Sequence, residues 1–187
     1  MTPEEVLDEV LEALEHNEIP YMVTGSYASN LHGTPRATID GDVVIDPAEA
    51  NLRAFVRSLQ QTYYADEAMA VEALRRRFMF NVIHLFSTYK IDLIIKKSSA
   101  YENTAFARKV KGTIIKKERW FISPEDIILA KLQWHSMGGS ERQLDDVIAV
   151  IKLNRGMLDM PYVRTWATTL RVDHILDKIL RAFEQDS

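Results

Sequence analysis

The sequence has no cysteine, and this absence removes several kinds of chemistry at once. A chain without cysteine cannot form disulfides, ligate zinc through thiolates or use a thiol as a nucleophile. It also lacks an apolar run of about 18 residues, the length that a membrane-spanning helix needs. The first residues, Met-Thr-Pro-Glu-Glu, are acidic and unlike a signal peptide. We therefore expect a cytoplasmic protein that does not bind membranes.

Lysine and arginine are missing from the first 20 positions, which hold seven acids. Residues 75–119 show the opposite bias, with twelve bases against three acids. A local basic region can attract phosphates even though the formal net charge of the whole chain is -4. Two interpretations remain open for this region. Arg75, Arg76 and Arg77 would contact an RNA backbone, or the bases are solvated helix faces and strand edges.

The hydrophobic pattern predicts strands in the first two-thirds of the 187-residue chain and helices in the last third. The strands are expected at 20–24, 38–45, 78–86, 89–96, 110–116 and 119–122. The helices are expected at 3–17, 27–32, 47–61, 66–77, 124–136, 140–153, 161–170 and 172–185. This order is typical of the α+β class, a mixed β-sheet flanked by helices. We expect a sheet domain over 1–122 and a helical extension over 123–187 packed on it.

Gly25 and Ser26 lie where the first expected strand ends and a helix begins. Such a junction directs backbone N–H groups and a helix N-terminus toward one point, which favours an anion such as phosphate. Glycine permits close approach of a ligand, and the Ser26 hydroxyl adds a hydrogen-bond donor. The alternative is a simple turn with a serine cap.

Asp40 and Asp42 are the most informative pair, because residues i and i+2 of a strand face the same side. Two carboxylates side by side repel each other unless a cation lies between them, and carboxylate oxygens are ligands for Mg²⁺. Asp92 interrupts a second apolar strand and would complete a three-carboxylate cluster that can hold two metal ions. Gly41 separates the first two acids and indicates a β-bulge that would turn one carboxylate away. The alternative is that Asp40-Gly41-Asp42 forms a turn.

These motifs, taken in order, resemble the minimal nucleotidyltransferases. The resemblance rests on Val23-Thr24-Gly25-Ser26 and on Gly33-Thr34-Pro35-Arg36-Ala37-Thr38-Ile39-Asp40-Gly41-Asp42. It continues in Ser123–Leu132 and in Ser140–Val147, and it is greatest to the branch of AbiEii-type abortive-infection toxins. It covers about residues 20–185. The family usually has an apolar residue where this chain has Gly41.

The resemblance implies a nucleotidyltransferase-like fold and a role for each matching residue. Asp40, Asp42 and Asp92 would be catalytic and would bind Mg²⁺ or Mn²⁺. The nucleoside triphosphate (NTP) would be bound by Gly25, Ser26, Arg36, Lys131 and Arg142. From the residues alone, Lys131 is equally a solvated helix charge, Arg142 the partner of Asp145 or Asp146 in a helix, and Arg36 a brace for Asp40.

The function that we expect is metal-dependent transfer of a nucleoside monophosphate from an NTP to an acceptor hydroxyl, with release of pyrophosphate. The acceptor would be tRNA or a protein, and the sequence also leaves a small molecule open. The alternative is a non-catalytic protein on the same fold, either a toxin–antitoxin partner or a nucleotide-binding module.

Overall fold

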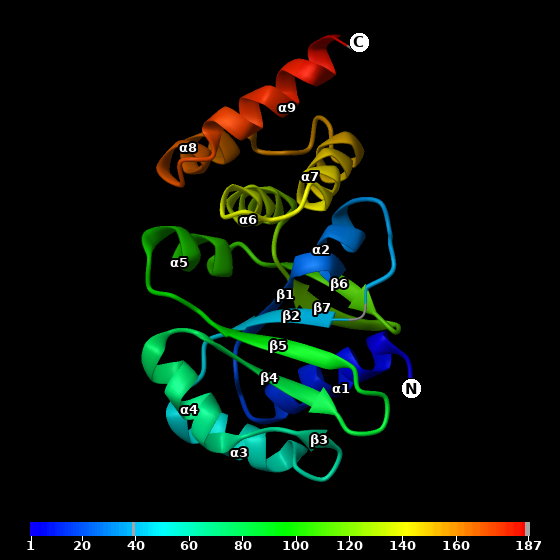
Figure 1. Ribbon diagram of the computed structural model, residues 1–187, viewed down its shortest axis with the longest axis vertical. Helices are drawn as coiled ribbons and strands as arrows, with labels where there is room; N and C mark the ends of the chain where they lie inside the picture. The colour runs from blue at the N-terminus through cyan, green and yellow to red at the C-terminus, as the bar shows by residue number, and fades with distance from the viewer. Residues whose placement is uncertain (39, 186–187) are drawn as a thin grey trace. The chain divides into compact units, whose positions relative to one another are not determined.

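The computed structural model describes residues 1–38 and 40–185 (Figure 1). Ile39, which falls within the predicted 38–45 strand, and residues 186 and 187 lie outside the described part. The strands in this part are β1 (Tyr21–Thr24), β2 (Asp40–Ile45), β3 (Tyr63–Tyr64), β4 (Met79–His84), β5 (Lys90–Ile95), β6 (Val110–Ile114) and β7 (Lys117–Phe121). The helices are α1 (Pro3–His16), α2 (Gly25–His32), α3 (Glu49–Leu59), α4 (Glu67–Arg76), α5 (Ala100–Ala107), α6 (Pro124–Ser136), α7 (Arg142–Leu153), α8 (Met160–Thr169) and α9 (Asp173–Gln185).

Helix α1 begins where its capping residues require. The Glu5 N–H donates to Thr2 Oγ1 at 3.2 Å, and the Thr2 N–H donates to the Glu5 carboxylate at 2.7 Å. This reciprocal capping box satisfies two backbone donors that the first turn leaves unpaired, and Pro3 occupies the first turn without loss of a hydrogen bond. The apolar stripe of the helix is buried, so both its start and its inner face follow from the sequence.

The structure contains two elements, β3 and α5, that the sequence pattern does not predict. Strand β3 is too short for any periodicity, and its pairing with β4 defines it. Helix α5 has no marked apolar face, but Ser99 caps it by accepting from the Glu102 N–H at 3.1 Å. Strand β7 begins two residues earlier than predicted, because the hairpin turn falls at Ile115 and Lys116, whose φ angles are 45° and 64°.

The chain divides into two compact units. The first comprises residues 1–27 and 37–122, and the second comprises residues 28–36 and 123–187. The segment 28–36 therefore groups with the C-terminal helices, whereas the sequence pattern gives no sign of this. Within the described residues, the first unit contains one mixed seven-stranded sheet in the order β3-β4-β5-β2-β1-β7-β6. Strand β2 is parallel to β5 and antiparallel to β1, which places the two acid-bearing strands side by side.

Helix α1 packs on β2 and α3 in the first unit, and α4 packs on α3 and β4 (Figure 1). Apolar side chains of α1 and of the central strands are fully buried in this layer, including Leu7, Leu11, Val23, Val43 and Leu93. Burial of this apolar surface is the main term that stabilises the unit.

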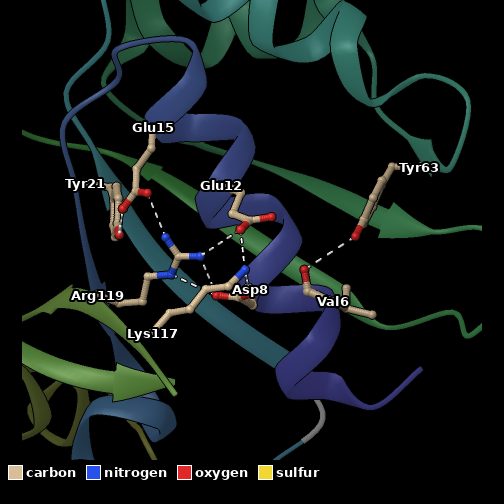
Figure 2. Close-up of polar contacts among 8 residues, drawn as sticks. All are labelled: Val6, Asp8, Glu12, Glu15, Tyr21, Tyr63, Lys117 and Arg119. Carbon is tan, nitrogen blue, oxygen red and sulfur yellow. Dashed lines mark hydrogen bonds and ion pairs between the residues drawn. The ribbon is translucent and has the colours of Figure 1, made fainter. Parts of the chain in front are cut away.

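A buried ion cluster also joins α1 to β7 (Figure 2). Arg119 is 3% exposed, and its guanidinium donates to Asp8 at 2.8 Å and to Glu15 at 2.7 Å. Lys117 pairs with Asp8 at 3.0 Å and also contacts Glu12. The acids at the start of the chain thus neutralise bases of β7, and these bases are not available to an external anion.

The second unit is helical. Helix α6 packs on α7 and α8, and α8 packs on α9. Ser123 caps α6 by accepting from the Asp126 N–H at 3.1 Å, and the buried Asp126 accepts from the Tyr162 hydroxyl at 2.8 Å. Across the described residues, no helix has both the length and the apolar character that crossing a membrane would require.

Candidate active site

Strand β2 presents its two acids on one face and Gly41 on the other. Asp40 is exposed, Asp42 is half-buried and Gly41 is buried between them, as the alternation of a strand requires. Asp42 is paired with Asp92 on the parallel strand β5, and Asp40 is paired with Lys90. Paired residues on neighbouring strands project to the same face, so Asp40, Asp42 and Asp92 share one side of the sheet.

The same row continues onto the flanking strands. Thr24 pairs with Asp42 from β1, and Asn81 pairs with Asp92 from β4. Thr24, Asp42, Asp92 and Asn81 therefore form a polar row across four adjacent strands. Thr24 and Asn81 were not among the predicted site residues, because the strand order that brings them into the row is not readable from a single sequence.

The predicted bulge at Gly41 is wrong. The pairing of β2 with β5 runs without interruption from Asp40 to Ile45. A methyl group added at Gly41 would lie 2.7 Å from Ile91 Cδ1 and 3.4 Å from Leu7 Cδ1. Glycine leaves room for the ends of the Ile91 and Leu7 side chains on the buried side of the strand. Both carboxylates keep their common orientation.

Gly25 is in close contact with Asp42. Its φ of +60° is one that residues with a side chain rarely adopt. A Cβ atom at this position would lie 2.6 Å from Asp42 Cγ and 2.9 Å from Asp42 Cβ. The Asp42 carboxylate thus lies against the backbone at the start of α2. Ser26 follows in the first turn of this helix.

Asp92 has an unusual environment for a carboxylate. It is 9% exposed, and its Oδ1 atom is buried without a hydrogen-bond partner in the described part of the chain. Its Oδ2 atom lies 3.0 Å from Lys90 Nζ. An unpaired buried carboxylate oxygen is costly in a folded chain, and such an atom is typical of a ligand or catalytic position.

Lys90 is the cation of this cluster, and it too was not predicted as a site residue. Its hydrogen bond to Asp92 raises the pKa of Lys90 above the ordinary value, and the charges of Asp92, Asp40 and Asp42 add to this effect, whereas burial opposes it. The sequence does contain a signal for it, because Lys90 and Asp92 are two residues apart on one strand and share a face.

The residues fit a metal site of the kind that includes substrate oxygens. Two adjacent carboxylates, one of them with an unpaired buried oxygen, supply the hard oxygen ligands that Mg²⁺ prefers. Among residues 1–38 and 40–185, no three His, Asp or Glu side chains are arranged to hold a metal ion by themselves. Mg²⁺ commonly uses one or two carboxylates together with substrate phosphates, so the pair Asp42 and Asp92 suffices for this class of site.

In the second unit, Arg36 and Lys131 converge on Asp146. Arg36 donates from Nε at 3.0 Å and from a terminal nitrogen at 2.9 Å, and Lys131 Nζ donates at 2.8 Å. Ser29 Oγ contacts the same carboxylate at 3.3 Å. Lys131 is only 6% exposed, so its interpretation as a solvated helix charge is wrong. Asp146 thus organises two of the predicted phosphate-binding residues.

Burial alone would raise the pKa of Asp146. The hydrogen bonds and charges of Arg36 and Lys131 outweigh this effect and hold the pKa below its ordinary value. Arg142 is exposed on α7 and forms no ion pair with Asp145 or Asp146 in the described part of the chain, which is contrary to the helix-bridge interpretation. The binding of a nucleotide by Arg36, Lys131 and Arg142 stays a prediction.

Comparison with known proteins places this geometry in context. No model of a known protein family matches the chain, and no curated protein sequence matches it significantly. Solved structures do match. The solution structure of the antibiotic-resistance factor ANT(2'')-Ia is 13% identical with a TM-score of 0.55, over 98% of this chain and 95% of that chain. The crystal structure of ANT(2'')-Ia in complex with adenylyl-2''-tobramycin is 14% identical with a TM-score of 0.59, over 91% of this chain and 98% of that chain.

A third structure, an antigenic nucleotidyltransferase-like protein from Paracoccidioides brasiliensis, is 15% identical with a TM-score of 0.52, over 96% of this chain and 92% of that chain. Similarity at this level of identity establishes the fold, and it confirms the expected mixed sheet with flanking helices. The chain has a nucleotidyltransferase-like fold.

Proposed function

We propose that the chain is a metal-dependent nucleotidyltransferase that moves a nucleoside monophosphate from an NTP to an acceptor hydroxyl. The observation that carries this proposal is the side-by-side pair Asp42 and Asp92. Asp42 lies against Gly25, and one buried carboxylate oxygen of Asp92 is unpaired within the described residues. The acceptor oxygen would bond to the α-phosphorus while the bond from that phosphorus to the pyrophosphate oxygen breaks. Pyrophosphate would leave, and the acceptor proton would pass to a carboxylate.

The chain's own residues divide this work. Backbone N–H groups at Gly25 and the Ser26 hydroxyl would hold the triphosphate at the start of α2, where the helix terminus favours negative charge. Asp42 and Asp92, with Asp40 as the third acid, would hold Mg²⁺ or Mn²⁺. When bound, the metal supplies charge neutralisation on the phosphates and activation of the acceptor oxygen. Asp92 Oδ1 would also accept the acceptor proton.

The acceptor is the least defined part of this function. We propose tRNA or a protein hydroxyl. The structure of ANT(2'')-Ia with adenylyl-2''-tobramycin makes a small-molecule hydroxyl a further candidate. The likeness to the AbiEii-type branch, a toxin–antitoxin partner and a cytoplasmic location are proposals that rest on the sequence.

One observation favours the alternative, a nucleotide-binding protein without catalysis. Lys90 already neutralises Asp92 at 3.0 Å, as an ammonium does in a purely structural ion pair. The two functions differ in one measurable property. An enzyme must exchange this contact for metal and substrate, whereas a binding module would retain it.

Transfer of label from each α-labelled NTP to total RNA, to protein and to aminoglycosides, measured with Mg²⁺ and with EDTA, tests the proposal. Asp42→Asn and Asp92→Asn should each lower the rate at least about 100-fold, because the metal contributes several kcal/mol of charge stabilisation. Asp145→Asn, a change at an exposed acid of α7, is the matched control and should retain the wild-type rate. NTP affinity that is equal with and without Mg²⁺, together with no transfer to any acceptor, would exclude the enzyme.

A further inference from the structure

The first unit carries a row of lysines interleaved with aromatic rings, which we name the lysine–aromatic row and define as Lys96, Phe106, Lys109, Trp120 and Lys111. Lys96 Nζ lies 5.7 Å from the centroid of the Phe106 ring, and Lys109 Nζ lies 4.3 Å from the same centroid. Lys109 Nζ is also 5.4 Å from the Trp120 ring, and Lys111 Nζ is 4.0 Å from it. Each ring thus has two ammonium groups near it.

This arrangement leaves positive charge available. Lys96 is partly neutralised, because it pairs with Asp46 at 3.3 Å and donates to Asn103 at 2.7 Å. Lys109 and Lys111 form no ion pair with any residue in the described ranges. A ring face attracts an ammonium without cancelling its charge, whereas a carboxylate does cancel it. Two ammonium groups thus lie beside aromatic rings, and no carboxylate within the described residues forms an ion pair with either.

Several other bases of segment 75–119 already have partners. Arg76 pairs with Glu72 at 2.5 Å, Arg77 donates to the Lys96 carbonyl at 3.0 Å, and Arg119 is buried against α1. Of Arg75, Arg76 and Arg77, which would contact an RNA backbone, the last two therefore already have partners, whereas Lys109 and Lys111 have no ion pair in the described ranges. Burial lowers the pKa of Lys109 from its ordinary value, and the neighbouring Lys111 adds to this, while Asp46 opposes it. An anion bound there would relieve the unfavourable charge.

The row lies on the same face of the sheet as the carboxylates. Lys111 pairs with Trp120 across β6 and β7, so the two side chains share a face. Val23 pairs with Phe121, so Trp120 belongs to the opposite face, which is that of Thr24 and Asp42. Strand β7 is separated from β2 by β1 alone. Two strand spacings of about 4.8 Å put Trp120 roughly 10–15 Å from Asp42. Lys111, on β6, lies one strand further away.

We propose that Lys109 and Lys111 bind the phosphate backbone of a single-stranded nucleic acid whose terminal hydroxyl is the acceptor. The proposal rests on the proposed function for the acceptor role, but the binding itself is independent of it. Unneutralised ammonium groups beside aromatic rings are the features that bind single strands, through phosphates and stacking. The nearest acid on this face of β7 is Glu118, which is exposed opposite Thr113, two pairs further from the carboxylates than Trp120.

Fluorescence anisotropy of a labelled 12-nucleotide RNA, titrated with the protein between about 50 and 200 mM salt, tests this surface. The Lys109→Gln/Lys111→Gln variant should bind at least about tenfold more weakly at 50 mM salt. The slope of log K against log salt should become shallower by about 1.4, because each phosphate contact on a single strand contributes roughly 0.7. Lys111→Arg keeps the charge and should retain binding.

Lys152→Gln is the matched control, because Lys152 lies 5.6 Å from the Phe183 ring in the second unit and has the same chemistry outside the row. It should bind RNA like the wild type. Far-UV circular dichroism and the melting temperature establish that each variant is folded. Absence of RNA binding by the wild type at 50 mM salt would overturn the proposal, as would equal affinity and slope for wild type and the double variant.

The failure of the two proposals can be told apart. Asp42→Asn should abolish transfer and leave RNA binding unchanged, and the double lysine variant should retain Mg²⁺-dependent NTP binding. If the wild type binds RNA through the two lysines but transfers nothing, the surface stands and the enzyme does not. A different result would refute RNA binding at Lys109 and Lys111 but support the nucleotidyltransferase. In that case the double variant still transfers label to a small molecule or a protein, and added RNA does not inhibit the transfer.

Discussion

Replacement of Gly25 by alanine tests the geometry of the candidate site most directly. The added methyl group would lie 2.6 Å from Asp42 Cγ and 2.9 Å from Asp42 Cβ, on a backbone with φ of +60°. Rotation of the Asp42 side chain moves Cγ but cannot move Cβ. The chain must therefore widen the separation of β1 and β2 near the pair Thr24 and Asp42, or rotate Gly25 out of its conformation.

The size of the effect follows from two contributions. The left-handed backbone costs alanine about 1–2 kcal/mol, and overpacking adds about 1–3 kcal/mol. The sum of about 2–5 kcal/mol corresponds to a fall in melting temperature of roughly 5–15 °C for a chain of this length. Because the change displaces the Asp42 carboxylate, we expect the transfer rate to fall even at temperatures where the variant is fully folded.

Gly138→Ala separates the two contributions. Gly138 has a φ of +92°, and among the described residues no atom other than those of Gly138 and its chain neighbours lies within 4 Å of the position that its Cβ would take. This variant should show the backbone cost alone and retain activity. Thermal unfolding with denaturant titration gives both values, and Asp42→Gly in the Gly25→Ala background should restore part of the lost stability. If Gly25→Ala destabilises the chain no more than Gly138→Ala does, the close contact with Asp42 is refuted.

Two further predictions concern charge. Lys90→Met should lower the melting temperature in EDTA by an amount equivalent to about 1 kcal/mol, because the carboxylates lose their cation. Mg²⁺ should restore it, while exposed Lys97→Met should have no effect; stability equal to wild type in EDTA would refute Lys90 as the resident counter-ion. The pKa of Asp146 is lowered in the folded state. Its contribution to the free energy of unfolding is therefore fully present at pH values above the ordinary aspartate pKa, near 4, and is lost as the pH falls through the lowered pKa. Asp146→Asn should therefore cost about 2–4 kcal/mol at pH 7 and progressively less below about pH 4, which urea unfolding across pH measures; a constant difference would contradict the assignment.

Much of the fold could be predicted because it is encoded locally. The Thr2 capping box, the apolar stripe of α1 and the Ser123 cap of α6 each depend on residues within a few positions of one another. The strand alternation that puts Asp40 and Asp42 on one face is local as well. Helix α5 and strand β3 escaped prediction, because neither has a periodicity that distinguishes it from a loop.

The candidate site could be predicted only in part, because only some of its features depend on residues that are close together in the sequence. Its acids and its glycine–serine junction stand out as residues that do not suit an apolar strand or that suit a tight turn. The contacts of these residues with partners that are distant in the sequence cannot be predicted from the sequence. Lys90 and Lys131 are chemically similar in the sequence, but one lies among the carboxylates of the sheet and the other is buried against Asp146.

By itself, the sequence determined the class of the fold, the helix starts and the common face of Asp40 and Asp42, since each follows from neighbouring residues and the period of the backbone. Only the tertiary structure decided that Asp92 lies beside Asp42, that Gly41 is enclosed by Leu7 and Ile91, and that Lys109 and Lys111 lie beside aromatic rings. Those facts depend on strand order and register, which arise from long-range packing of apolar faces. Many strand orders are compatible with the same pattern of hydrophobic and polar residues, and the burial of the apolar faces of the whole sheet selects one of them.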